Sequence, residues 1–187
     1  MSKTELKKHL QSLSKEQVIE QVLELYGNCK PAKEYLEYFL NPDEKGQFEK
    51  YKAIIINEFS GEKRMPKMRF SVAKKAISDF RQLNPSPVLY GELMVTFAEA
   101  ACKLAFSSGD LWEQYYDTTA NNYEAALKFL QKNNLLANFK LRCHDCVKHS
   151  KHCGYGFEDL MEQLFKEYYG WFFTNFLKCG KIIQVVL

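Results

Sequence analysis

The chain has 187 residues, of which 46% are hydrophobic, while only nine are glycine and five are proline. This composition excludes a disordered or low-complexity protein, and the length suits one folded domain. The 26 basic and 23 acidic residues give a net charge of +3, which is too balanced to indicate a polyanionic partner.

The sequence shows no targeting or membrane segment. Mixed polar residues follow Met1 where a signal peptide would have an apolar stretch, and no run of 18 apolar residues occurs. We therefore expect a cytoplasmic protein without a membrane span. The six cysteines are then expected to be reduced thiols or metal ligands and not a disulfide framework.

The first third of the chain carries three sets of helix signals. Ser14 opens a capping box, and the apolar residues behind it recur at helical spacing until Gly27. Pro31 suits the first turn of a short second helix. Asn41 and Pro42 have the residue types of an N-cap and a first helical position, so a third helix is expected to begin there. The apolar positions of these helices are Val18, Ile19, Val22, Leu23, Tyr26, Tyr35, Leu36, Phe39, Leu40, Phe48, Tyr51, Ile55 and Phe59.

Five further helices are predicted between residues 72 and 169. Asn84-Pro85-Ser86-Pro87 ends the first of them and caps the second, Ser107-Ser108-Gly109 precedes the third, and Gly154-Tyr155-Gly156 precedes the last. Regular apolar spacing marks the second and the last as helices that pack in the core. The residues expected to be buried there are Leu93, Phe97, Leu104, Leu160 and Leu164.

These elements predict an all-α fold of seven to nine helices in antiparallel pairs, because short loops join successive helices and useful strand patterns are otherwise absent. An irregular, repeat-like superhelical stack is one form of that arrangement. We expect residues 1–187 to form a single helical domain with an apolar C-terminal extension over residues 170–187. The last seven residues suit either a strand or a packed tail.

Several segments are familiar in their order along residues 1–169. They read SKTELKKHLQSLSKEQVIEQVLELY, YFLNP, AISDF, GDLWEQYYDTT and GYGFEDLMEQLFKEYY. Together they resemble an uncharacterised family of small helical bacterial proteins, a domain of unknown function typical of Bacteroidetes. The resemblance implies an all-α fold and implies no activity, substrate or catalytic residue.

A short run of cysteines and histidines lies between Cys143 and Cys153. Thiolate and imidazole ligands suit zinc, so Cys143, Cys146, His149 and Cys153 are the candidate ligands. Structural zinc sites usually draw their ligand pairs from separated segments, whereas this run is mostly one helix. Cys143 and Cys146 also share the apolar stripe of that helix. We therefore favour core packing over metal binding, and metal binding over thiol redox chemistry.

A basic segment extends from Lys63 to Arg81, with seven basic residues and one acidic residue, Asp79. Its candidate contacts to a phosphate-bearing partner are Lys67, Arg69, Lys74 and Lys75. No nucleic-acid-binding motif accompanies them, and lysine and arginine are ordinary solvent-facing residues of helices. A solvated helix face is therefore the favoured interpretation.

The sequence contains no familiar catalytic motif, so we expect a protein that is not an enzyme and needs no cofactor. Aromatic residues gather around Trp112 and again in the apolar extension, where Trp171, Phe172, Phe173 and Phe176 are candidate interface residues. The favoured hypothesis is a helical module that binds another protein or a second copy of itself. The alternatives are a nucleic-acid-associated protein that uses residues 63–81 and a small zinc-binding protein that uses residues 143–153.

Overall fold

The computed structural model describes residues 1–61 and 65–179, with side chains as far as Gly170. Within these residues all regular structure is helical, in nine helices, which confirms the predicted all-α fold. The chain divides into two compact units, residues 1–44 and residues 45–187. A single domain over residues 1–187 stays a prediction.

Three short helices make up the unit of residues 1–44. Ser2 and Ser14 precede the first two, and each forms a capping box in which the serine hydroxyl accepts from the backbone N–H three residues on. In return, the side chains of Glu5 and Gln17 accept from the serine N–H groups. These bonds satisfy amides that have no partner inside the helix. The helices are α1 (Lys3–Ser12), α2 (Lys15–Asn28) and α3 (Lys30–Leu40).

The helix expected to begin at Asn41 and Pro42 begins later. Asn41 ends α3, because its N–H donates to the carbonyl of Glu37. The residue before a proline avoids the α conformation, so Pro42 separates two helices and does not open one. The next helix, α4, begins at Glu44. The sequence prediction was therefore wrong about this boundary, although it was right about the capping box at Ser14 and the position of Pro31.

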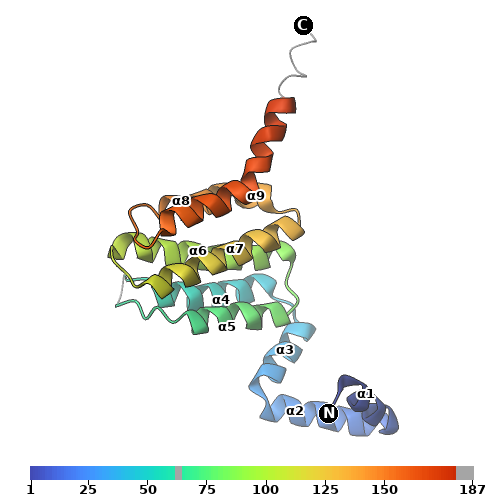
Figure 1. Cartoon of the computed structure of the whole chain (residues 1–187). Helices are drawn as coiled ribbons and strands as arrows, with labels where there is room; N and C mark the ends of the chain where they lie inside the picture. The colour runs from blue at the N-terminus through green and yellow to red at the C-terminus, as the bar shows by residue number, and fades with distance from the viewer. Residues whose placement is uncertain (62–64, 180–187) are drawn as a thin grey trace. The chain divides into compact units, whose positions relative to one another are not determined.

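The second unit consists of three layers of paired helices, as Figure 1 shows: α4 with α5, α6 with α7, and α8 with α9. The long α6 lies in the centre and contacts α5, α7 and α8. Gly91 brings α6 close to α7, since a Cβ at this position would lie 2.9 Å from Leu130 Cδ2. The helices are α4 (Glu44–Phe59), α5 (Phe70–Gln82), α6 (Pro87–Ser108), α7 (Glu113–Lys132), α8 (Leu136–Lys148) and α9 (Phe157–Cys179).

Tyrosine hydroxyl groups join the helices of this unit, both within a layer and between layers. Tyr115 and Tyr123 on α7 donate hydrogen bonds to backbone carbonyls of α6 and α8, at 2.9 and 3.0 Å. Tyr169 on α9 donates to the carbonyl of Leu136 on α8 at 3.0 Å. All three rings are at most 1% exposed. Each tyrosine therefore fills the core with its ring and satisfies its polar end.

The predicted core is confirmed at Leu93, Phe97, Leu104 and Leu164, which are all buried. Leu160 was predicted wrongly, because its side chain is 39% exposed. The buried stripe of α9 is centred on Met161, and Leu160 lies about 100° around the helix from that residue. It therefore lies at the margin of the stripe.

The C-terminal helix does not end at Gly170 but continues to Cys179. The strand or packed tail expected over the last seven residues lies outside the described part of the chain. None of the helices that the structure describes is long and apolar enough to cross a lipid bilayer.

Candidate docking surface

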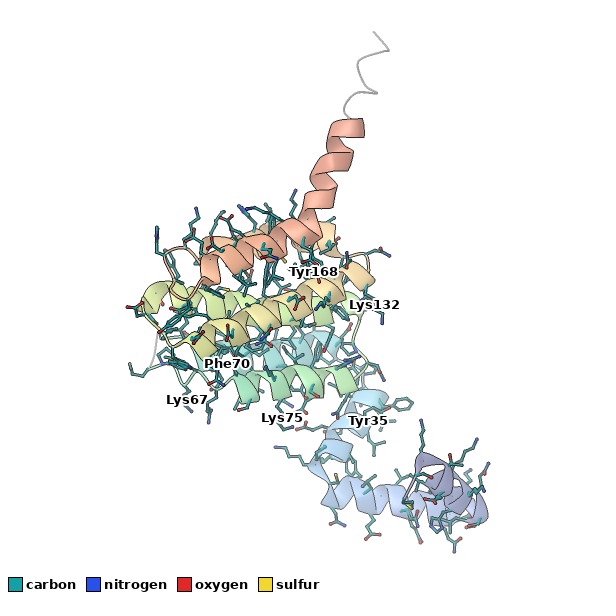
Figure 2. All side chains as sticks on the ribbon, in the orientation of Figure 1. Tyr35, Lys67, Phe70, Lys75, Lys132 and Tyr168 are labelled. Atoms are coloured by element: carbon teal, nitrogen blue, oxygen red, sulfur yellow. The ribbon has the colours of Figure 1, made fainter. Side chains whose placement is uncertain are left out.

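The helices of residues 1–44 each carry an apolar stripe. In α2 the stripe includes Ile19, Val22 and Leu23, and in α3 it includes Tyr35 and Phe39 at a spacing of four residues. Tyr35 is labelled in Figure 2. Such stripes normally face the core of a domain.

Within the unit of residues 1–44 these stripes are not covered, because no residue of α1, α2 or α3 is buried. Phe39 is 69% exposed and Leu40 73% exposed. Large apolar groups gathered in one part of a protein in this way indicate a surface for a partner. We call this set the docking surface. It consists of Leu6, Ile19, Val22, Leu23, Leu25, Tyr35, Phe39 and Leu40.

Polar contacts at exposed positions connect α2 with α3. The Tyr26 hydroxyl donates a 2.9 Å hydrogen bond to Glu37, and this bond raises the pKa of Tyr26. Lys33 lies over the Tyr26 ring and 3.9 Å from the Glu37 carboxylate. Contacts of this kind contribute little to stability in water. They orient the two helices but do not replace a core.

Charge is distributed unevenly over the three helices. Residues 1–44 contain six lysines and eight acidic residues. In α1, three lysines outnumber the single acid, Glu5, whereas in α2 three glutamates outnumber the single lysine, Lys15. The surface therefore combines a basic helix and an acidic helix, each next to exposed apolar residues.

Two of the four predicted anion contacts are engaged within the protein. Arg69 forms a two-pronged ion pair with Glu58, at 2.7 and 2.9 Å, and this pairing lowers the pKa of Glu58. Lys75 binds both carboxylate oxygens of Asp79, at 2.7 and 2.9 Å. Lys67 and Lys74 are exposed, and Figure 2 shows the side chains of Lys67 and Lys75 projecting away from the helices. Lys63 and Arg64, at the start of the basic segment, lie outside the described residues.

The four candidate metal ligands lie in different environments. Cys143 and Cys146 are fully buried in the core, whereas Cys153 is half-buried and its sulfur lies 3.9 Å from the carbonyl oxygen of His149. Burial raises the pKa of Cys143 to about 11, which favours the thiol over the thiolate that zinc binds. The Cys146 thiol hydrogen-bonds with Cys102, a residue that the sequence pattern did not single out, and this contact together with burial raises the pKa of Cys146.

No group of three or more histidine, cysteine, aspartate or glutamate side chains could hold a metal ion in the part of the chain that the structure describes. His149 Nδ1 lies 2.7 Å from the carbonyl oxygen of Asp145, and the His149 ring contacts Phe106 edge-on. The candidate ligands thus make packing and backbone contacts.

A groove of about 570 Å³ lies between α4 and α6. Arg142 of α8 reaches its wall, where the guanidinium binds Glu99 at 2.7 and 2.9 Å and Thr96 at 3.0 Å. Glu92 lies 3.5 Å from the same group. The guanidinium is therefore already neutralised by acidic residues, and we assign no ligand to this groove.

The interface predicted from the sequence and the docking surface lie in different parts of the chain. The predicted interface residues Trp171, Phe172, Phe173 and Phe176 have side chains outside the described residues. The docking surface of residues 1–44 was not predicted, because its apolar positions were used only to predict helices. The lengths of the three helices could have indicated that their apolar stripes are exposed. The three helices are short, with 10, 14 and 11 residues, and a unit of this size has difficulty covering all its own apolar stripes.

Comparison with known proteins identifies a family for this chain. A model of a family of unknown function (DUF6155) matches residues 1–168. No curated protein and no solved structure matches the chain. The matched residues include the whole docking surface and nearly all of the described core, and the match confirms the predicted resemblance to a family of unknown function. The chain belongs to this family of unknown function.

Proposed function

We propose that the protein is a helical binding module and that it binds helical segments of protein through the docking surface of residues 1–44. One observation carries the proposal: three helices with apolar stripes lie in a unit in which no residue is buried. Isolated helices of this length are marginally stable in water. A partner that covers the stripes would therefore also stabilise the helices.

The charge of the unit favours protein over nucleic acid or an anionic membrane. Eight acidic residues against six lysines give residues 1–44 a negative balance, which repels phosphate-rich surfaces. The ion pairs of Arg69 and Lys75 also reduce the basic charge available elsewhere. An amphipathic helix laid along another apolar helical face is the recognition mode that fits these features.

Capture from a native lysate tests the proposal. The variant combines Leu23→Glu with Phe39→Glu, which places two charges on the docking surface. The matched control is Leu141→Glu on α8, since Leu141 is 80% exposed but lies outside residues 1–44. We expect proteins captured by the wild type to be retained by the control and lost by the double variant.

Hydrogen exchange of the dilute protein provides the second measurement. Amides of α1, α2 and α3 should exchange much faster than those of α6 and α7, because no buried side chains protect them. Equal protection in both units would contradict the proposal, since it would show that the docking surface is already covered in the single chain.

A further inference from the structure

Resting on that proposed function, we infer that the partner is a second copy of this chain and that two docking surfaces pair symmetrically. In this dimer, α1 of one copy lies along α2 of the other. A two-fold axis makes the same contact twice, so one surface must supply both halves of it. The docking surface meets this requirement in charge.

The charges of α1 and α2 are opposite and equal in number. The side chains of α1 give a net charge of +2, from three lysines and Glu5, and those of α2 give −2, from Lys15 and three glutamates. Like helices therefore repel, whereas α1 and α2 of different copies attract. Opposite charges beside an apolar seam select the orientation and the partner in paired helices.

The docking surface offers exposed apolar side chains to a second copy. Its eight side chains are between 40% and 73% exposed. Ile19, Val22 and Leu23 share one face of α2, whereas Leu25 lies about 200° around the helix from Leu23, so a contact of α1 along α2 uses the first three. Tyr35 and Phe39 belong to the aromatic residues that often dominate interface energies.

Sedimentation analysis of the full-length protein over a range of concentrations tests the pairing. We expect the wild type and Leu141→Glu to dimerise equally, because Leu141 lies outside the docking surface. Leu23→Glu with Phe39→Glu should weaken the dimer by about a hundredfold or more, since each copy would bury unpaired charges. Circular dichroism of every variant checks that residues 45–187 remain folded.

Charge reversal tests the arrangement of the helices. Lys3→Glu with Lys7→Glu changes the net charge of α1 from +2 to −2, and Glu20→Lys with Glu24→Lys changes that of α2 from −2 to +2. Each pair of changes alone should weaken the dimer by about tenfold. All four changes in one chain restore opposite charges and should restore dimerisation.

The outcomes separate this inference from the proposed function. A wild type that stays monomeric at every concentration overturns the inference. If that monomer still captures a protein through Leu23 and Phe39, the proposed function survives with a different partner. A dimer that the double glutamate variant leaves unchanged overturns the inference as well, because the contact then lies elsewhere. Failure of the four-fold charge variant to recover overturns the pairing of α1 with α2.

Discussion

Phe39 in α3 and Phe97 in α6 both belong to the apolar stripe of a helix, yet Phe39 is 69% exposed and Phe97 is 1% exposed. The difference lies in their neighbours. Phe97 contacts the rings of Phe59 and Phe70, whereas the unit that contains Phe39 buries no residue. A stripe therefore defines which face of a helix is apolar, and other helices decide whether that face is covered. Matched substitutions in the two regions test this comparison.

The largest difference in stability between the two regions should come from truncating one phenylalanine in each. Phe97→Ala removes a buried ring between helices and should lower the free energy of unfolding by about 3–5 kcal/mol. Phe39→Ala should change it by less than about 0.5 kcal/mol in dilute protein. Urea unfolding followed by circular dichroism measures both. Similar losses for the two variants would show that Phe39 is covered in the single chain.

The second comparison concerns ion pairs. Glu58 is 4% exposed and is bound by Arg69, whereas Lys33 and Glu37 form an exposed pair. Arg69→Gln should cost about 1–3 kcal/mol, because it leaves a buried carboxylate without its charged donor. Lys33→Gln should cost no more than about 0.5 kcal/mol. Urea unfolding of both variants at neutral pH measures the difference.

The stabilisation by the ion pair of Glu58 and Arg69 should depend on pH. Arg69 holds the pKa of Glu58 below its ordinary value of 4.5, so the unfolded state takes up the proton first as the pH falls. The stabilisation is complete above pH 4.5 and is lost as the pH falls through the folded-state pKa. The stability difference between wild type and Arg69→Gln should therefore shrink in acid. A difference that stays constant down to about pH 3 would contradict the assignment.

The smallest difference in stability between the two regions should come from removing one tyrosine hydroxyl in each. Tyr123→Phe loses a buried hydrogen bond to the carbonyl of Cys143 and should cost about 1 kcal/mol. Tyr26→Phe loses an exposed bond to Glu37 and should change the stability less than Tyr123→Phe does. Urea unfolding measures the first, and hydrogen exchange in α2 and α3 measures the second. Equal effects would remove the distinction between the two regions at polar contacts.

Most of the fold could be predicted from local signals. The helix-capping box at Ser14, Pro31 in the first turn of α3, and the stripe that contains Leu93 and Phe97 all depend on residues close in sequence. The error at Asn41 arose because asparagine before proline suits both the end of one helix and the start of another. Leu160 was misplaced because the centre of a stripe depends on where the neighbouring helices pack.

The candidate site was less predictable. The pairing of Lys75 with Asp79 follows from a spacing of four residues on a helix. The pairing of Arg69 with Glu58 does not, because the two residues lie near opposite ends of the segment between α4 and α5. The exposure of Leu23 and Phe39 could not be predicted from periodicity, which is the same for a covered stripe and an uncovered one.

The interior tyrosines set an alkaline limit to the fold. Burial raises the pKa values of Tyr115, Tyr123 and Tyr169 above the ordinary value of 10.0, so their phenol groups stay protonated in the folded protein. The unfolded chain releases these protons as soon as the pH passes about 10, which draws the equilibrium towards unfolding. The hydroxyls that hold these helices together at neutral pH thus make the same helices separate in strong base, and ionised phenolate would appear together with the loss of helix.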